Sequence, residues 1–386
     1  MKSSRERILT THVGSLPRSD AVLKLLEARE VNASCDQAGF EQSVRQAVLD
    51  IVKRQVDTGI DVVSDGETSK ISYATYVHDR LSGFSDEGSP GPPKPHLDVA
   101  AFPDFRKKMA QLTGAQRFKR VTCVGPIKVQ NRDALARDVA NMRAAVDAAG
   151  PAEAFLTAAS PGVVASFLPN RYYSSHEAYI EAIADAMREE YEAIVGAGFI
   201  LQLDCPDLAM SRHTGFQDLT EAEFLKRAAF HVDVLNHALA NVSADRVRMH
   251  VCWGNYEGPH THDIDFSKIV TIVLRAKVQG IALEAANPRH AHEWAVWEEV
   301  KLPDDKILLP GVIDTSTNYV EHPALVAERI VRFADVVGRE RVIANSDCGF
   351  GTAAGSGKLD PEIVFLKLGA LADGAALATT QLWGRT

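Results

Sequence analysis

The sequence predicts a (β/α)8 barrel, and three observations carry that prediction. Short β-branched runs recur along the 386 residues, segments with apolar residues at three- and four-residue spacing lie between them, and helix-capping residues mark the boundaries. Such alternation is typical of a parallel sheet wound by crossover helices. Eight strands alternating with helices over about 330 residues agree with the size of one closed barrel.

The elements follow in chain order. The predicted strands are Asp61–Ser64, Arg120–Val124, Phe155–Ala158, Phe199–Leu203, Arg246–Val251, Gly280–Leu283, Lys306–Pro310 and Arg341–Ala344. The predicted helices are Glu41–Thr58, Ala134–Ala148, Glu177–Ala197, Glu221–Ala240, Phe266–Gln279, Pro323–Val337 and Pro361–Ala376. Helix N-caps are expected at Ser175, Thr220 and Asp360, and helix ends just before Gly59, Gly198 and Gly280. A doubly wound open sheet is the alternative, because periodicity alone does not prove that a sheet closes.

We expect residues 1–386 to form a single barrel domain with two additions. Residues 1–60 precede the first predicted strand and are read as an N-terminal extension. Residues 82–119 begin with the Gly- and Pro-rich stretch SGFSDEGSPGPPKP and interrupt the alternation after that strand. They are read as an inserted excursion with a helix around Asp104–Leu112, and not as a domain boundary.

The composition of the chain limits the classes of partner that it is expected to bind. The chain has 42 Lys and Arg against 51 Asp and Glu, a net charge of −9 without a basic block, which argues against nucleic acid. No uninterrupted apolar run approaches the roughly 20 residues of a membrane span. Five cysteines, an odd and widely spaced number, and the polar start MKSSRER predict a cytoplasmic protein. We therefore expect small-molecule partners and leave a homo-oligomer open.

Polar residues gather where the predicted strands end, which is where barrels build their active sites. His250 and Cys252 are two apart on one strand, so their side chains point to the same face, and imidazole with thiolate suits zinc. Cys348 and Glu284, at the ends of strands eight and six, are the candidates for further ligands. The H-x-C spacing by itself is equally typical of a buried cysteine beside a core histidine.

The remaining candidates stay open. Cys35 and Cys123 are interpreted as structural, and Cys205 should point away from the face that Asp204 uses. The loop pairs His260/His262 and His290/His292 could bind metal or act as acids, although exposed loop histidines usually only titrate. The glycine clusters after Cys348 match neither the P-loop nor the dinucleotide fingerprint, so nucleotide binding is not predicted.

Several motifs together resemble the cobalamin-independent methionine synthase family, specifically its catalytic C-terminal barrel and its single-barrel relatives, which include epoxyalkane:coenzyme M transferases. Thr11-His12-Val13-Gly14-Ser15-Leu16-Pro17 is similar to the family's T-x-x-G-S-x-P motif, and Asp65-Gly66-Glu67 to its H-G-E turn. Leu201-Gln202-Leu203-Asp204 is similar to its I-Q-I-D strand, and Asp347-Cys348-Gly349 to its P-D-C-G ending. With Met249-His250-Val251-Cys252 and Glu284, the resemblance covers about residues 8 to 352.

This resemblance implies a zinc site of His250, Cys252, Glu284 and Cys348 that binds and activates a thiol. It also implies that Glu67 and Asp204 hold the amino group of homocysteine, and that Gly14 and Ser15 hold its carboxylate. Two features depart from the family. The chain is too short for the second barrel of the long methionine synthases, and the family's D-x-H-S motif after strand seven reads Asp314-Thr315-Ser316-Thr317.

The expected function is a zinc-dependent alkyl transfer, in its methyl version, from an alkyl donor to a small-molecule thiol. A zinc-bound thiolate would attack the donor, since zinc deprotonates a coordinated thiol at neutral pH. One alternative is epoxide opening by coenzyme M, whose sulfonate would need cations such as Arg18 or Lys70. Another is a metal-free decarboxylase of the porphyrinogen decarboxylase type, and a third is a non-enzymatic binding protein. No catalytic residue is assigned: His213, His260, Tyr172 and Tyr173 are equal candidates for the proton donor.

Overall fold

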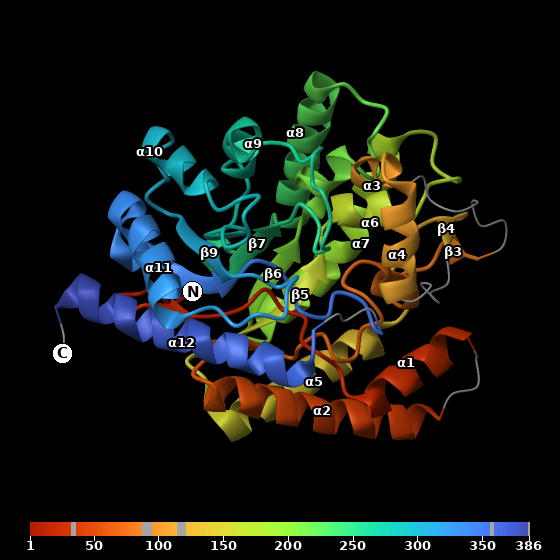
Figure 1. Ribbon diagram of the computed structural model, residues 1–386. Helices are drawn as coiled ribbons and strands as arrows, with labels where there is room; N and C mark the ends of the chain where they lie inside the picture. The colour runs from red at the N-terminus through yellow and green to blue at the C-terminus, as the bar shows by residue number, and fades with distance from the viewer. Residues whose placement is uncertain (32–35, 87–94, 114–120, 356–358, 385–386) are drawn as a thin grey trace.

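The computed structural model describes residues 1–31, 36–86, 95–113, 121–355 and 359–384, and it contains an eight-stranded parallel barrel (Figure 1). The strands neighbour one another in the order β1-β10-β9-β8-β7-β6-β5-β2, and a parallel bridge between Thr11 and Val62 joins the two ends. Thr11 Oγ1 also donates to the carbonyl of Val62 at 2.8 Å. The predicted (β/α)8 barrel is therefore confirmed. The barrel strands are β1 (Leu9–Thr10), β2 (Val62–Ser64), β5 (Glu153–Ala159), β6 (Ile200–Asp204), β7 (Val247–Val251), β8 (Gly280–Leu283), β9 (Ile307–Ile313) and β10 (Ile343–Ser346).

One of the eight predicted strands forms but does not belong to the barrel. The run Arg120–Val124 contains β4 (Thr122–Cys123), which pairs antiparallel with β3 (Phe84–Ser85) outside the barrel. The first barrel strand is instead β1, which comes from the segment read as an N-terminal extension. A β-branched run shows that a strand forms but not which partner it takes, and a two-residue strand shows no period at all.

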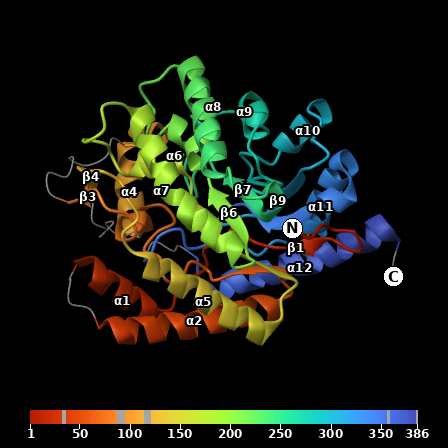
Figure 2. The same cartoon turned by 180° about the vertical axis from the view of Figure 1, so that it is seen from behind.

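Helices cover the outside of the barrel, and Figures 1 and 2 show them on all sides of the strands. Expected caps are present: Ser175, Thr220 and Asp360 each accept a hydrogen bond from the first turn of the following helix. Gly280 is not a helix end, because it begins β8. The α-helices are α1 (Asp20–Val31), α2 (Gln37–Asp57), α3 (Leu97–Ala100), α4 (Pro103–Thr113), α5 (Arg132–Ala149), α6 (Pro161–Phe167), α7 (His176–Gly196), α8 (Glu221–Ala238), α9 (Phe266–Val273), α10 (Val296–Glu299), α11 (Pro323–Val337) and α12 (Pro361–Trp383).

The C-terminal helix α12 is long and apolar enough for a membrane span by length and composition alone, and half of its most apolar window is buried. It packs along α11 and also contacts β1, β9 and β10 (Figure 1). Leu368 and Leu371 of this helix are fully buried in the main hydrophobic core. Its apolar composition is thus accounted for by packing against the barrel.

A polar layer inside the barrel holds the loop that follows β1. Arg248 on β7 donates to the Thr11 hydroxyl at 3.0 Å and to the carbonyl of His12 at 2.8 Å, while its guanidinium stacks on Phe155. Gln202 on β6 accepts from Arg248 and donates to the carbonyl of Val13. Buried polar groups need such partners. The backbone immediately before Gly14 is therefore anchored to two strands on the opposite side of the barrel.

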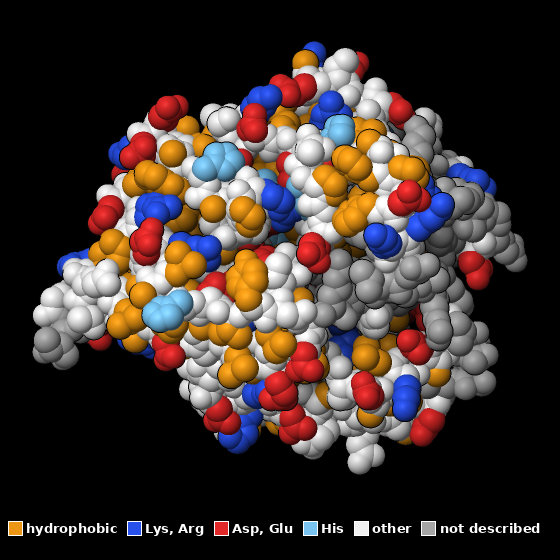
Figure 3. Space-filling model, viewed as in Figure 1, with side chains coloured by type: hydrophobic (Ala, Val, Ile, Leu, Met, Phe, Trp, Pro, Cys, Tyr) orange, Lys and Arg blue, Asp and Glu red, His pale blue; other side chains and the backbone are white. Residues whose placement is uncertain are grey.

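Residue types on the surface are mixed. On the face of the described chain shown in Figure 3, acidic and basic side chains are interspersed among apolar ones.

A histidine pair between α7 and α8 predicts a loss of stability in acid. His176 Nε2 lies 2.9 Å from His231 Nε2, and His231 Nδ1 lies 2.9 Å from Asp207. Burial, and then the neighbouring His231 and Arg227, lower the pKa of His176 to about 4, against about 6.5 when unfolded. The unfolded chain therefore binds more protons between these values, and stability falls as the pH drops from about 6.5 to about 4.

We expect His176→Gln to flatten this decline by about 2 kcal/mol, a value reduced for the partial exposure of His176. Urea unfolding midpoints of both proteins from pH 4 to 8 provide the measurement. His292→Gln, a change at an exposed histidine, is the control. Parallel pH curves for wild type and His176→Gln would contradict the assignment.

Candidate metal centre and substrate pocket

Three of the four predicted metal ligands lie together at the carboxyl ends of the strands. One ligand atom each from His250, Cys252 and Cys348 falls within 4.8 Å of the other two. His250 is on β7, Cys252 follows it, and Cys348 follows β10. All three side chains are buried. The i, i+2 spacing places His250 and Cys252 on one face, as expected, and tertiary folding brings Cys348 to them across the barrel mouth.

The chemistry of these three residues fits a tetrahedral cation. The two sulfur atoms are 3.7 Å apart, too far for a disulfide, whereas two sulfurs bound to one zinc ion at about 2.3 Å would lie about 3.8 Å apart. Neither ring nitrogen of His250 has a hydrogen-bond partner among the described residues. Burial lowers the pKa of His250 to about 3, so its imidazole is neutral and offers a lone pair at neutral pH.

The Cys252 thiol needs a cation to ionise. The adjacent Cys348 thiol, together with burial, raises the pKa of Cys252 well above its usual range. The Gly254 N–H lies 3.3 Å from the Cys252 sulfur and favours the thiolate. A bound divalent ion would instead lower the pKa of Cys252, because a coordinating thiol is deprotonated outright.

Glu284, the fourth predicted ligand, lies beside this cluster with both carboxylate oxygens already hydrogen-bonded. Oε1 accepts from the backbone N–H of Trp253 at 2.8 Å, and Oε2 accepts from Asn287 and Arg289, each at 2.9 Å. Its ligand role remains a prediction. Asp347, next to Cys348, accepts three backbone N–H groups from Ala285 to Asn287, each at 2.8 Å, and so ties the Glu284 loop to the Cys348 loop.

The predicted substrate residues form a second group around two buried carboxylates. Burial raises the pKa of Glu67, and burial with the nearby Glu67 carboxylate raises that of Asp204 well above its usual range. Oε2 of Glu67 has no partner within the described chain. Two carboxylates that disfavour each other's ionisation form a site suited to a cation such as an ammonium group.

Gly14 lies directly against the Glu67 carboxylate. Its φ is +146°, and a Cβ atom there would lie 2.6 Å from Thr157 Cγ2 and 3.1 Å from Glu67 Oε1. The position therefore requires glycine. Ser15 faces the loop after β10 instead: its hydroxyl accepts from Gly351 N at 3.3 Å, and its carbonyl accepts from Phe350 N at 2.8 Å. Gly14, Glu67 and Asp204 are thus brought together, with Ser15 beside them.

Tyr73 is a site residue that the sequence reading missed. Burial raises the pKa of its phenol well above the usual value, and the charges of Cys252, Cys348, Asp204 and Glu67 raise it further. The phenol is therefore close to both the thiols and the carboxylates. Its position six residues after Glu67, in the loop that follows β2, was the available signal, because loops at this end of a barrel supply site residues.

The other histidine and cysteine candidates fall outside this centre. His260 and His290 are buried, so the expectation that loop histidines are exposed was wrong for them, whereas His292 is exposed. Cys123 and Cys205 are buried, in agreement with a structural role, and Cys35 lies outside the described residues. The Tyr173 phenol accepts from Ile127 N at 2.9 Å, and Tyr172 is exposed. Asp314 accepts hydrogen bonds from Ser316 and Thr317 of its own loop.

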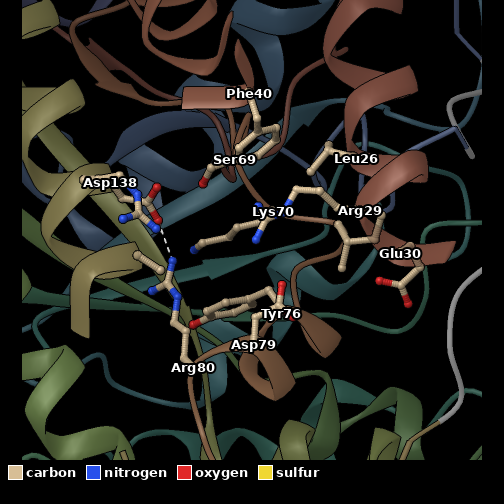
Figure 4. Close-up of a pocket in the computed structure, with 13 residues that line it drawn as sticks. Leu26, Arg29, Glu30, Phe40, Ser69, Lys70, Tyr76, Asp79, Arg80 and Asp138 are labelled. Atoms are coloured by element: carbon tan, nitrogen blue, oxygen red, sulfur yellow. Dashed lines mark hydrogen bonds and ion pairs between the residues drawn. The ribbon is translucent and has the colours of Figure 1, made fainter. Parts of the chain in front are cut away.

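A pocket of about 100 Å³ lies outside the barrel mouth, between α1, α2 and α5 (Figure 4). Two of its cations are engaged by the protein: Arg80 pairs with Asp138 and, at 2.8 Å, with Glu190. Lys70 donates to the Thr157 carbonyl at 2.5 Å. The buried Ser69 hydroxyl, which also lines the pocket, has no hydrogen-bond partner among the described residues.

The fold and the site define a barrel protein with an imidazole–dithiol cluster and a carboxylate pair at the carboxyl ends of its strands. The chain belongs to the family described as cobalamin-independent synthase, catalytic domain, whose model matches residues 8–89 and 125–360.

Relatives and solved structures extend this match over nearly the whole chain. A methionine synthase of Sulfolobus acidocaldarius is 26% identical over 88% of this chain and 85% of its own, and one of Thermococcus kodakarensis is 24% identical over 97% and 94%. A B12-independent methionine synthase from Shewanella sp. W3-18-1, in complex with selenomethionine, superposes with a TM-score of 0.74 at 19% identity, covering 98% of this chain and 100% of that one. The structural match shows the same fold.

Proposed function

We propose that this chain is a zinc-dependent methyltransferase that transfers a methyl group to the thiol of homocysteine. The observation that carries the proposal is the pairing of two groups at one barrel mouth: the buried His250–Cys252–Cys348 cluster and the buried Glu67–Asp204 carboxylate pair. The charges of both groups raise the pKa of the Tyr73 phenol, which supports a common site for one small molecule. The methionine synthases that resemble the chain over most of their length support the same function.

His250, Cys252 and Cys348 would hold the zinc ion, with Glu284 as the predicted fourth ligand. When bound, zinc would lower the pKa of a substrate thiol and so make the thiol nucleophilic at neutral pH. Arg289 and Asn287 already hold Glu284 on one side of the cluster. Asn287 and Arg289 can keep the Glu284 carboxylate in this position when a substrate thiol occupies the space next to the cluster.

Glu67 and Asp204 would bind the substrate ammonium group. An ammonium between them would restore the ionised form of both carboxylates, since an opposite charge lowers their raised pKa values. Gly14 leaves the space beside Glu67 that any larger residue would fill. The residues of this chain thus orient an amino thiol by its amine and exclude water from it by burial.

The geometry favours homocysteine over coenzyme M as the thiol. Arg18 and Lys70 are the cations that a sulfonate would need, but both are already committed to the protein. Arg18 donates to the carbonyls of Gly351 and Glu67 at 2.7 and 2.8 Å, and Lys70 donates to Thr157. Arg289, a further cation near the thiols, pairs with Glu284 at 2.9 Å, and the buried Glu67 and Asp204 carboxylates repel a sulfonate.

The direct test is methionine formation by purified, zinc-loaded protein. Homocysteine is supplied with an N-methyl donor (5-methyltetrahydrofolate) or, in parallel, with an S-methyl sulfonium donor, and the product is identified by mass spectrometry. We expect methionine with one of the two donors and zinc in the active protein. Thioether formation from coenzyme M and an epoxide, without methionine formation from homocysteine, would overturn the proposal.

The amine contact gives a sharper prediction. Glu67→Gln is expected to lower kcat/KM for homocysteine about 10- to 100-fold, because a hydrogen bond to a charged group contributes about 1.5–3 kcal/mol. Methylation of 3-mercaptopropionate, a thiol without an amine, should change less than threefold. Asp204→Asn is the matched variant and should show the same selectivity for the amino thiol. Equal losses with both thiols would contradict an ammonium site.

A further inference from the structure

A second cluster of potential metal ligands lies outside the centre described above. Asp98, His260 and Asp263 each offer one ligand atom, and these three atoms lie within 4.8 Å of one another. Asp98 is on α3, in the segment inserted after β2, whereas His260 and Asp263 are in the loop after β7. Asp98 and His260 are buried. Acidic clusters alone do not define a site, so the case depends on the histidines.

His213, which follows β6, is the second observation. It is fully buried, and within the described ranges neither of its ring nitrogens has a hydrogen-bond partner. Nδ1 lies 3.4 Å from Asp263 Oδ1, and Nε2 lies 3.6 Å from Asp98 Oδ2. These distances are long for hydrogen bonds, but two nitrogen or oxygen ligands at about 2.05 Å from one tetrahedral ion lie about 3.3 Å apart. Each nitrogen of this buried imidazole thus faces a different carboxylate at ligand spacing, and one of the two nitrogens can bind an ion held by the cluster.

His260 has the hydrogen bonding of a metal-bound imidazole. Its Nε2 lies 3.0 Å from the carbonyl of Tyr256, which can only accept, so this nitrogen carries a proton. Nδ1, the other ring nitrogen, lies 2.9 Å from the Asp263 carboxylate. A metal ion bound by Nδ1 and by Asp263 would replace this contact. Metal-bound histidines commonly donate their other N–H to a backbone carbonyl in this way.

Further contacts orient the acidic ligands. The Tyr256 hydroxyl donates to Asp98 Oδ2 at 2.5 Å, and the His262 N–H donates to Asp98 Oδ1 at 2.8 Å. His290 lies 3.2 Å from Asp263 and 3.0 Å from Glu293. His260 has a φ of +50°, unusual for a residue other than glycine, so the local fold holds its ring in place at a cost in backbone strain.

We propose that Asp98, His260 and Asp263, with His213 as the fourth donor, bind a divalent transition-metal ion separate from the one at His250, Cys252 and Cys348. Two imidazoles and two carboxylates suit Zn²⁺, Fe²⁺ or Mn²⁺. The ion fastens α3, and with it the inserted segment, to the loop that follows Cys252. The site is structural, and it does not depend on the proposed methyl transfer.

The test is the metal content of purified protein dialysed against Zn²⁺ and then against buffer, measured by elemental analysis. We expect two equivalents in the wild type, one in Cys252→Ser/Cys348→Ser, and one in Asp263→Asn. His262→Ala is the matched control: it removes an imidazole that contacts Asp98 at 3.1 Å but is not a proposed ligand, and it should keep two equivalents.

A second readout separates metal loss from misfolding. In the Cys252→Ser/Cys348→Ser background, added Zn²⁺ or Mn²⁺ should raise Tm, since an ion that binds only the folded state stabilises it. Adding His213→Gln to this background should abolish the rise while circular dichroism stays unchanged. The proposal is overturned when the Cys252→Ser/Cys348→Ser protein binds no metal and shows no Tm shift. Failure of the thiol site alone would instead remove one equivalent from the wild type and leave the Asp263-dependent equivalent in place.

Discussion

Replacing Cys348 with serine is expected to remove the thiol-bound zinc and to reduce methyl transfer on the order of 1,000-fold. The sulfur of Cys348 lies 3.7 Å from that of Cys252, and both belong to the cluster that also contains His250. A metal that activates a nucleophile contributes several kcal/mol to the transition state, and each 1.36 kcal/mol corresponds to a factor of ten. Elemental analysis and initial rates with homocysteine measure the two effects.

Cys123→Ser provides the matched control, because Cys123 is also buried but lies on β4, away from the barrel mouth. This variant should keep both its zinc and its rate. Full zinc content and full activity in Cys348→Ser would refute the metal centre. Loss of zinc with unchanged activity would refute only its part in catalysis.

Lys367→Met is expected to destabilise the protein by about 3–5 kcal/mol, because it leaves a buried carboxylate without its partner. Lys367 on α12 donates to Glu321 at 2.8 Å and to the Tyr319 carbonyl at 2.6 Å, and both side chains of the pair are fully buried. Glu321 in turn accepts from the Asp314 N–H at 2.7 Å, in the loop after β9. Denaturant unfolding of wild type and variant gives the difference.

The double variant Glu321→Gln/Lys367→Met should recover most of that loss. Glutamine keeps an oxygen for the Asp314 N–H and removes the buried charge. Lys53→Met, which breaks an exposed ion pair with Asp57, should cost less than about 0.5 kcal/mol. A Lys367→Met protein as stable as the wild type would show that the buried pair does not hold the β9 loop to α12.

Local pattern accounts for what the sequence predicted well. Helices and most barrel strands follow from periodicity and caps, which depend on neighbouring residues only. The same holds for His250 and Cys252, since residues two apart on a strand share a face. The two-residue strand β1 carries too few residues for a pattern, and Arg120–Val124 forms a strand whose partner lies outside the barrel. Whether a strand belongs to a closed barrel depends on the strands with which it pairs, and those partners lie far away in the sequence.

Long-range contacts explain the rest of the site. Cys348 reaches Cys252 because β10 and β7 end at the same barrel mouth, a meeting that was expected only from the predicted closure of the barrel. Tyr73 enters the site through the course of the loop after β2. His260 and His290 occur in loop stretches that read as solvated, yet Asp98 and His213 arrive from distant segments and enclose that region.

The sequence by itself therefore determined the barrel class, the helix boundaries at their caps, and the pair His250 and Cys252. Only the tertiary structure decided that β1 opens the barrel, that both carboxylate oxygens of Glu284 are hydrogen-bonded beside the thiol cluster, and that Asp98, His260 and Asp263 come together. The physical reason is the same in each case. Periodicity and capping energies act between residues a few positions apart, whereas burial and ligand geometry depend on which distant segments pack together.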